Sequence, residues 1–336
     1  MSLSVAHPKT GLRRGLLPDV FTNALYACSP YRGCNHACAY CDGRAEKYYV
    51  EGDFARDLVQ RENLPELLAE ELPRLRERDS QGRRPLLSLG SGVTDAYQPW
   101  ESRLSLTRRV AEILVAHAQP TLLITKSALV ARDIELWSEL HEKAGFVLLM
   151  SLALGDEHLR RRLEPGASPL AARVETRRRL AERGIPVGVL AMPLLPGLSQ
   201  DPDTIGTIFG QAVQAGACFV MPGGLTLRPG RQKEHYLRAL ARVAPGLVGP
   251  TSELYVEERP SGAPIRAAQQ ALMETVRPIQ QASGLPWFLP HHVLRKIVPE
   301  YEALHLLFGQ MAELYGARGI TTAPLRQASS RYADWL

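Results

Sequence analysis

The chain has 336 residues, 45% of them hydrophobic, and carries 40 lysine and arginine residues against 35 aspartate and glutamate residues. This length fits one barrel or two smaller domains, and the apolar content is sufficient for a large core. No apolar run has the length of a membrane span, and the first residues lack the apolar core of a secretory leader. Five cysteines, an odd number, argue against a disulfide framework. We therefore expect a cytoplasmic protein with reduced thiols and no membrane partner.

Strand-like and helix-like segments alternate through the first two thirds of the chain. The apolar runs predict strands at 24–28, 85–89, 121–125, 146–152, 185–192 and 217–221. Helical periodicity between them predicts helices at 64–78, 104–117, 132–143, 169–183 and 203–215. Strands that alternate with helices in this way indicate parallel β/α units. The right-handed crossover rule wraps such units into a barrel or part of one.

The alternation stops after Arg231, where helices are expected at 232–243, 267–281 and 301–314. The expected division is therefore an N-terminal tail (1–22), a barrel core (23–230) and a mostly helical C-terminal extension (231–336). The basic excess gathers in arginine clusters at 83–84, 160–162 and 177–179. These clusters suit either solvated helix faces or a footprint for a phosphate backbone.

Three of the five cysteines, Cys34, Cys38 and Cys41, lie close together in a C-x3-C-x2-C spacing. Closed structural metal sites use four ligands, whereas three protein ligands leave one position open for another molecule. The three thiolates are therefore predicted to bind an iron–sulfur cluster and to leave one of its iron atoms without a protein ligand. The alternative is a zinc knuckle that recruits His36 as its fourth ligand. Cys28 and Cys218 lie in predicted strands and are expected to be small core residues.

This cysteine spacing, with Tyr40 directly before the last cysteine, resembles that of the radical S-adenosylmethionine (SAM) enzymes. Further segments are similar to the spore photoproduct lyase-like group of that superfamily. They are Leu89 to Glu101 (with the pattern T-D-x-Y-Q-P-x-E), 124–127 with Arg132 and Asp133, 162–169 with Arg173, and 192–198. Together these motifs extend over about residues 24–230, and all of them fall at the carboxyl ends of predicted strands, where barrels carry their chemistry.

The resemblance implies an α/β fold with a partial (β/α)6 barrel of the TIM type, open on one side for large substrates. It also implies a 4Fe–4S cluster on Cys34, Cys38 and Cys41, with SAM bound at the open iron. Reductive cleavage of SAM then gives a 5′-deoxyadenosyl radical that abstracts hydrogen from a substrate. The substrate is unidentified, with DNA or RNA as candidates. A reductant such as flavodoxin or ferredoxin is the implied protein partner.

The resemblance further implies which residues contact SAM. Tyr40 is expected near the adenine, and the backbone of Gly90 and Ser91 near the methionyl amino group. Asp95 belongs to a polar patch beside them. Contacts to the ribose and the carboxylate of SAM are expected from Lys126, Ser151 and Arg173. Each of these residues equally suits a structural role in loop packing, in a turn at the strand end or in the barrel rim.

The chain departs from spore photoproduct lyase at two positions. That enzyme has a tyrosine directly after the third cysteine and a hydrogen-donating cysteine after the second strand, where this chain has Asp42 and Gly92. Repair of a thymine dimer is therefore not expected. Two alternative functions remain: an iron–sulfur oxidoreductase that only transfers electrons, and a zinc-stabilised nucleic-acid-binding module.

Overall fold

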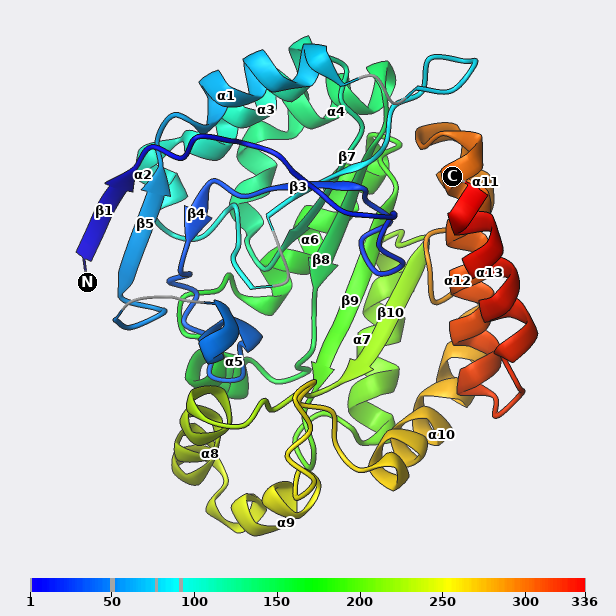
Figure 1. The fold of residues 1–336 in the computed structure, drawn as a ribbon. Coiled ribbons are helices and arrows are strands. Elements are labelled where there is room, and N and C mark those ends of the chain that lie inside the picture. Colours follow the sequence, from blue (N-terminus) through cyan, green and yellow to red (C-terminus); the bar gives the residue numbers. More distant parts are fainter. Residues whose placement is uncertain (1, 49–51, 76–77, 91–92, 336) are drawn as a thin grey trace.

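The main sheet carries six parallel strands, as the sequence predicts (Figure 1). The computed structural model describes residues 2–48, 52–75, 78–90 and 93–335. In spatial order the parallel strands are β10 (Phe219–Gly224), β9 (Val187–Leu194), β8 (Phe146–Ser151), β7 (Thr121–Thr125), β6 (Leu87–Leu89) and β3 (Tyr26–Cys28). The short strand β2 (Arg13–Arg14) adds an antiparallel edge next to β3. Among the described residues β10 pairs only with β9, so the sheet is open at that edge.

Helices cover the outer face of this sheet. They are α1 (Leu64–Glu71), α2 (Glu101–Leu104), α3 (Leu106–Ala116), α4 (Ile134–Lys143), α6 (Leu170–Glu182) and α7 (Pro202–Gln214), with the short α5 (Glu157–Leu163) near the strand ends. Every residue of β7 and β8 is buried. Strands covered on both faces are apolar along most of their length, because neither side meets water. This is why their continuous apolar runs made them predictable.

The predicted N-terminal tail contributes two strands, β2 in the main sheet and β1 in a small second sheet. β1 (Ser2–Ala6) pairs in parallel with β5 (Asp57–Arg61), which also pairs with β4 (Tyr31–Arg32) in a small second sheet. The partners of β1 lie more than fifty residues away in the sequence, and its side chains are mostly exposed. Neither property leaves a local pattern, so the sequence gives no sign of these strands.

The C-terminal extension is helical, as predicted. It contains α8 (Arg231–Val243), α9 (Val248–Glu253), α10 (Arg266–Ser283), α11 (His291–Ile297), α12 (Glu300–Ala317) and α13 (Ala323–Trp335). α11 and α12 pack against the inner face of the sheet, where Leu294 and Leu306 share a core with Leu122 and Leu149. The 3-10 helices are η1 (Asp42–Arg44), η2 (Glu46–Tyr48), η3 (Leu72–Arg74), η4 (Ala128–Asp133) and η5 (Pro245–Leu247). In the described part of the chain no helix has the length and apolarity needed to cross a membrane.

Candidate functional site

The motif residues meet at one end of the barrel. The cysteine loop follows β3, Asp95 follows β6 and Lys126 follows β7, while Ser151 ends β8 and Met192 lies near the end of β9. Parallel strands present their carboxyl ends at the same edge of a sheet, so these side chains come together although they are far apart in the sequence. The predicted placement at the strand ends is confirmed for these residues, whereas the motif 162–169 lies at the end of α5 and in the turn before α6.

The cysteine loop is fixed by backbone hydrogen bonds on two sides. The Cys34 amide donates to the Phe54 carbonyl (3.0 Å), and the Ala39 amide donates to the Leu163 carbonyl (2.8 Å). From the segment after α5, the Gly166 amide donates to the His36 carbonyl (3.0 Å). The loop therefore depends on its neighbours for its shape, and α5 with its following turn is one of them.

Of these contacts, the one between Gly166 and the cysteine loop leaves the least space. A Cβ atom added there would lie 2.1 Å from the Asn35 carbonyl oxygen and 2.9 Å from the His36 Cα, which is closer than nonbonded atoms approach. We expect Gly166→Ala to displace the cysteine loop and to lower the iron content of reconstituted protein to less than about half. The matched control is Gly206→Ala in α7, where nothing lies within 4 Å and alanine favours the helix by about 1 kcal/mol. Equal iron content in the two variants would contradict the prediction.

The three cysteine thiols lie in a buried and partly cationic environment. Cys34 and Cys38 are each 6% exposed, and Cys41 is half-buried. Burial raises the pKa of all three, and the Asp95 carboxylate and the other two thiols raise that of Cys34 further. Lys126 opposes the effect at both Cys38 and Cys41. Buried thiols of this kind give up their protons to a metal centre that replaces the missing charge.

These donors fit an iron–sulfur cluster. In a 4Fe–4S cluster each cysteine binds a different iron, so the three sulfurs surround the cluster and need not converge on one point. In the described residues no group of three or more His, Cys, Asp or Glu side chains is arranged to hold a metal ion. His36, the fourth ligand of the zinc alternative, instead faces Asp95, with 3.3 Å between its Nδ1 and Oδ2 of the carboxylate.

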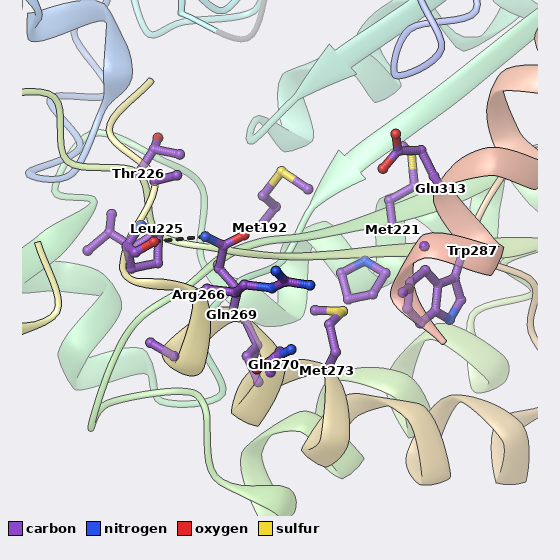
Figure 2. A pocket seen from close by; sticks show the side chains of 18 of the residues that line it. Met192, Met221, Leu225, Thr226, Arg266, Gln269, Gln270, Met273, Trp287 and Glu313 are labelled. Carbon is purple, nitrogen blue, oxygen red and sulfur yellow. Dashed lines mark hydrogen bonds between the residues drawn. The ribbon is translucent and has the colours of Figure 1, made fainter. Parts of the chain in front are cut away.

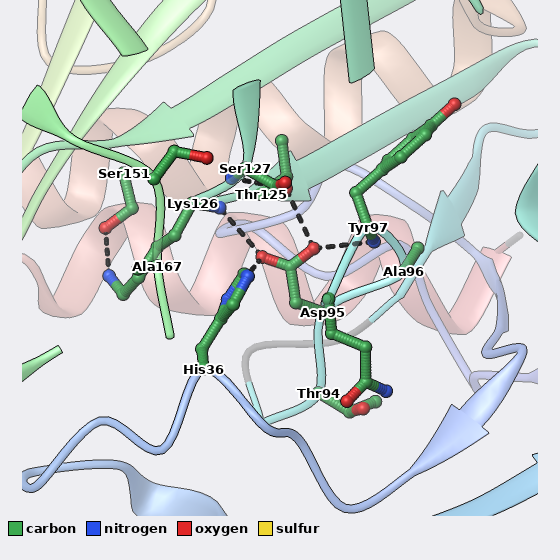
Figure 3. Close-up of polar contacts among 12 residues, drawn as sticks. His36, Thr94, Asp95, Ala96, Tyr97, Thr125, Lys126, Ser127, Ser151 and Ala167 are labelled. Carbon is green, nitrogen blue, oxygen red and sulfur yellow. Dashed lines mark hydrogen bonds and ion pairs between the residues drawn. The ribbon is translucent and has the colours of Figure 1, made fainter. Parts of the chain in front are cut away.

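Asp95 connects the cysteine loop to two strand ends (Figure 3). Its carboxylate accepts hydrogen bonds from the Thr125 hydroxyl (2.8 Å), the Lys126 amide (2.7 Å) and the Tyr97 amide (2.8 Å), and it also pairs with His36. Burial alone would raise the pKa of Asp95, but His36 and these donors hold it below its ordinary value. The carboxylate is therefore ionised and braces the loops after β3, β6 and β7. Its predicted contact with SAM stays a prediction.

Glu164 lies at the centre of a second buried network. Its carboxylate accepts from the Tyr40 hydroxyl, lies 2.5 Å from Nη2 of Arg173 and lies 3.7 Å from Nζ of Lys126. The Lys126 ammonium also donates to the Ser151 hydroxyl. Burial would raise the pKa of Glu164, but Arg173 and Lys126 outweigh it and lower the pKa to about 2. Four of the predicted SAM-contacting residues thus gather around a carboxylate to which the sequence analysis gave no role.

The Arg173 guanidinium is fully buried and is engaged by the protein on all sides. Besides Glu164, it donates to the Ser151 carbonyl (3.2 Å) and to the Ser168 carbonyl (2.9 Å). These bonds fix the end of β8 to α6. In the described contacts Arg173 therefore positions the site, and a direct bond to SAM stays a prediction.

Gly90 ends β6 in a backbone conformation that favours glycine, with φ at +79°. Its amide donates to the Cys28 carbonyl (2.9 Å), which ties the end of β6 to the start of the cysteine loop. The predicted contact Ser91 lies outside the described residues, as does Gly92. The role predicted for the Gly90 and Ser91 backbone stays a prediction.

A cavity of about 1040 Å³ opens beside this site (Figure 2). Three of the chain's six methionines line it, from β9, β10 and α10, together with the aromatic side chains Trp287 and Phe288. The Ser151 hydroxyl donates to the Met192 carbonyl (3.3 Å), so one residue connects the Lys126 network to the cavity wall. The C-terminal extension supplies the outer wall, with Arg266, Arg277, Arg318 and Arg326 among its side chains.

The arginine clusters of the sequence are largely used within the chain. Arg160 is buried and donates to the Glu164 and Ala167 carbonyls, and Arg178 pairs with Glu175. Arg177 is buried and has no hydrogen-bond partner among the described residues. Arg160 and Arg177 therefore serve the fold, whereas Arg178 lies on an exposed helix face beside a carboxylate.

Comparison with known proteins identifies relatives of this chain. The sequence model of the radical SAM superfamily matches residues 28–206. An uncharacterised protein of Mycobacterium tuberculosis (strain H37Rv) is 33% identical over 234 residues, which cover 68% of this chain and 67% of the relative. An uncharacterised protein of Methanocaldococcus jannaschii is 27% identical over 230 residues, which cover 68% of this chain and 81% of the relative.

Solved structures show the same fold. A mutant of spore photoproduct lyase matches with a TM-score of 0.58 and 15% identity over 83% of this chain and 79% of that chain. Spore photoproduct lyase complexed with dinucleoside spore photoproduct matches over the same shares with a TM-score of 0.57 and 16% identity. At this identity the likeness concerns the fold, and it confirms the predicted partial barrel.

The superfamily match includes all three motif cysteines and more than half of the chain. Enzymes of this superfamily use a 4Fe–4S cluster and SAM, so the predicted enzyme class and cofactors are confirmed at the level of the family. The match gives no support to an electron-transfer protein or to a zinc module. The chain belongs to the radical SAM superfamily.

Proposed function

We propose that Cys34, Cys38 and Cys41 bind the cluster, that SAM binds at its open iron, and that the enzyme abstracts hydrogen from a substrate containing nucleotides. The observation that carries this proposal is the single buried loop that holds all three thiols beside Lys126 and within reach of the Asp95 and Glu164 networks. When bound, the cluster and SAM supply the one-electron cleavage that yields a 5′-deoxyadenosyl radical. All five cysteines are free, which suits the reducing cytoplasm that we propose as its location.

The chain's own residues hold and orient SAM in this proposal. Tyr40 offers a ring to the adenine; its hydroxyl is fixed by Glu164, and the Lys126 ammonium lies 5.6 Å from its ring centroid. Lys126 and Ser151, at the ends of adjacent strands, offer an ammonium and a hydroxyl to the ribose or the carboxylate. Backbone carbonyl oxygens at Gly90 and Ser91 are the proposed acceptors for the methionyl amino group, because the Gly90 amide already donates to Cys28. Asp95 and Arg173 keep these groups in position through their hydrogen bonds.

The cavity beside Met192 supports a nucleic-acid substrate. Trp287 and Phe288 offer surfaces on which a base stacks, and arginines of the C-terminal extension offer contacts to phosphates. The fold neighbour spore photoproduct lyase has been solved in complex with a dinucleoside spore photoproduct. The reaction proposed here differs from that repair, because Asp42 takes the position of the repair enzyme's tyrosine. The Asp42 carboxylate accepts from Arg228 and from the Tyr48 hydroxyl, each at 2.8 Å.

The test is an anaerobic assay of SAM cleavage by reconstituted, dithionite-reduced protein. We expect slow formation of 5′-deoxyadenosine from SAM alone, and an increase of about tenfold or more with single-stranded DNA or RNA that contains the correct site. The product is measured by chromatography and mass spectrometry, with dinucleotide spore photoproduct as a further arm. Cluster-loaded protein that yields no 5′-deoxyadenosine over hours would contradict the cleavage reaction. Stimulation by neither DNA nor RNA would contradict the substrate class, and release of two thymines would contradict the distinction from repair.

A further inference from the structure

Helix α8 lies outside the part of the chain that the superfamily model matches, and it has two different faces. Gln232, Tyr236 and Leu240 are buried. On another side of the helix, positively charged and histidine side chains recur at a spacing of three or four residues, which places them in one row. We call this row the basic stripe: Arg231, His235, Arg238 and Arg242.

The buried face of α8 lies directly on the cysteine loop. The Gln232 side-chain amide donates to the Tyr40 carbonyl (3.1 Å), and Tyr236 and Leu240 share a core with Cys38. In Figure 1 the segment 42–48, which follows the loop, lies next to α5 and α8. The basic stripe is thus one helix thickness away from the cysteines.

Two further arginines extend the stripe towards the loop. Arg44 donates to the carbonyls of Cys38 (3.0 Å) and Ala37 (3.3 Å). Arg162, from α5, donates to the Arg242 carbonyl. Arg44, Arg162 and Arg242 have no carboxylate partner among the described residues, whereas Arg238 lies 3.5 Å from Glu234 and Arg231 lies 3.9 Å from Glu46.

The local field is positive. Burial, together with the nearby Arg44, Arg238 and Arg242, lowers the pKa of His235 to about 4 against the opposing charge of Asp53. His235 is therefore neutral at pH 7, and the charge of this surface is carried by permanently charged guanidinium groups. The side chains of Arg238 and Arg242 are exposed. None of the residues of the stripe lines the substrate cavity, so a partner on this face leaves that cavity accessible.

We propose that the basic stripe, with Arg44 and Arg162, is the docking surface for an acidic one-electron carrier protein that reduces the cluster. This proposal rests on the proposed function, because only an enzyme that binds the cluster needs such a carrier. The carrier loses one electron and the cluster gains it, passing from its 2+ to its 1+ state, and no bond forms or breaks. A carrier with a negative surface is attracted to this face and is held close to the cysteines without entering the substrate cavity.

The test uses the Arg238→Glu/Arg242→Glu variant of the cluster-loaded protein. Its affinity for flavodoxin and for ferredoxin is measured by biolayer interferometry at low ionic strength, and cluster reduction by each reduced carrier is followed by stopped-flow absorbance. We expect dissociation constants to rise and second-order reduction rates to fall about tenfold or more, with the difference shrinking as salt is added. The matched control is Arg179→Glu/Arg183→Glu, which reverses two exposed charges at the same spacing at the end of α6.

The outcomes separate this proposal from the proposed function. Weaker binding of one carrier or of both in the stripe variant alone supports the docking surface and identifies the carrier. Equal affinities and equal reduction rates in the stripe variant, the control and the wild type would overturn it. SAM cleavage driven by dithionite, which needs no docking, is expected to stay within about twofold of wild type in both variants. Failure of that reaction in every protein would count against the proposed function, while the binding measurement would still decide the docking surface.

Discussion

Replacement of Cys34, Cys38 or Cys41 by alanine is expected to abolish the broad visible absorption of the reconstituted protein and to reduce SAM cleavage to background. Each of the three is predicted to bind a separate iron of the cluster, and the described residues contain no further cysteine in the loop to replace a lost ligand. The measurements are iron and sulfide content, the visible spectrum and the yield of 5′-deoxyadenosine, all under anaerobic conditions.

The two remaining cysteines provide matched controls. Cys28 is buried in β3, and burial raises the pKa of its thiol to about 12. Cys218 packs against the inner core, and burial raises its pKa to about 11. Both thiols stay protonated at pH 7 and behave as small apolar side chains. Cys28→Ala and Cys218→Ala should therefore keep the full iron content. Retention of the cluster by a Cys38→Ala variant, or stoichiometric zinc in place of iron, would contradict the ligand set.

The barrel was predictable because its strands are buried on both faces. β7, β8 and β9 appear in the sequence as continuous apolar runs, and the intervening helices begin or end close to the predicted limits. The local pattern did not predict α2, α5, α9, α11 or α13. α11 is a short helix whose apolar residues pack against the inner face of the sheet and against α12. Such a helix is specified by tertiary packing rather than by a local pattern.

The candidate site was predictable in part, for a different reason. Motif residues such as Asp95, Lys126 and Ser151 follow strands, so strand order alone brings them to one edge. What each of them bonds to depends on distances between loops that no spacing encodes. Glu164 shows this most clearly, since it lies in a quoted motif but gains its role only from contacts with Tyr40, Lys126 and Arg173. Gly166 is similar. A side chain at this position would collide with the cysteine loop, and only the folded structure shows that the loop lies there.

Replacement of Glu164 by glutamine is the second change with a large expected effect. Arg173 is fully buried, and its pair with Glu164 compensates its charge. Removing one partner of a buried ion pair leaves the other charge uncompensated, which typically costs about 3–5 kcal/mol. Tyr40 and Lys126 lose the same partner, so the site loosens as well. We expect a decrease of about this size in the free energy of unfolding, measured by anaerobic urea titration, together with weaker SAM binding.

The effect should depend on pH with a defined sign. The pKa of Glu164 in the folded protein is about 2, below its ordinary value of 4.5. Because the unfolded chain binds the proton first as the pH falls, the stabilisation is complete above about pH 4.5 and is lost progressively towards pH 2. Between pH 5 and pH 3 the free energy of unfolding of the wild-type protein should therefore fall by a contribution that Glu164→Gln lacks at every pH. The difference between the two proteins should narrow over this range.

Two further variants make the test specific to the buried pair. Glu135→Gln removes a carboxylate that pairs with Arg183 while being 74% exposed, and an exposed pair contributes at most about 1 kcal/mol. In the Glu164→Gln/Arg173→Met double variant the uncompensated guanidinium is gone, so part of the lost stability should return. If Glu164→Gln cost no more than Glu135→Gln, or if the double variant were less stable by the sum of the two single losses, Glu164 would not be the centre of the network. Tyr40, Lys126 and Arg173 would then have to be held in place by the cofactors themselves.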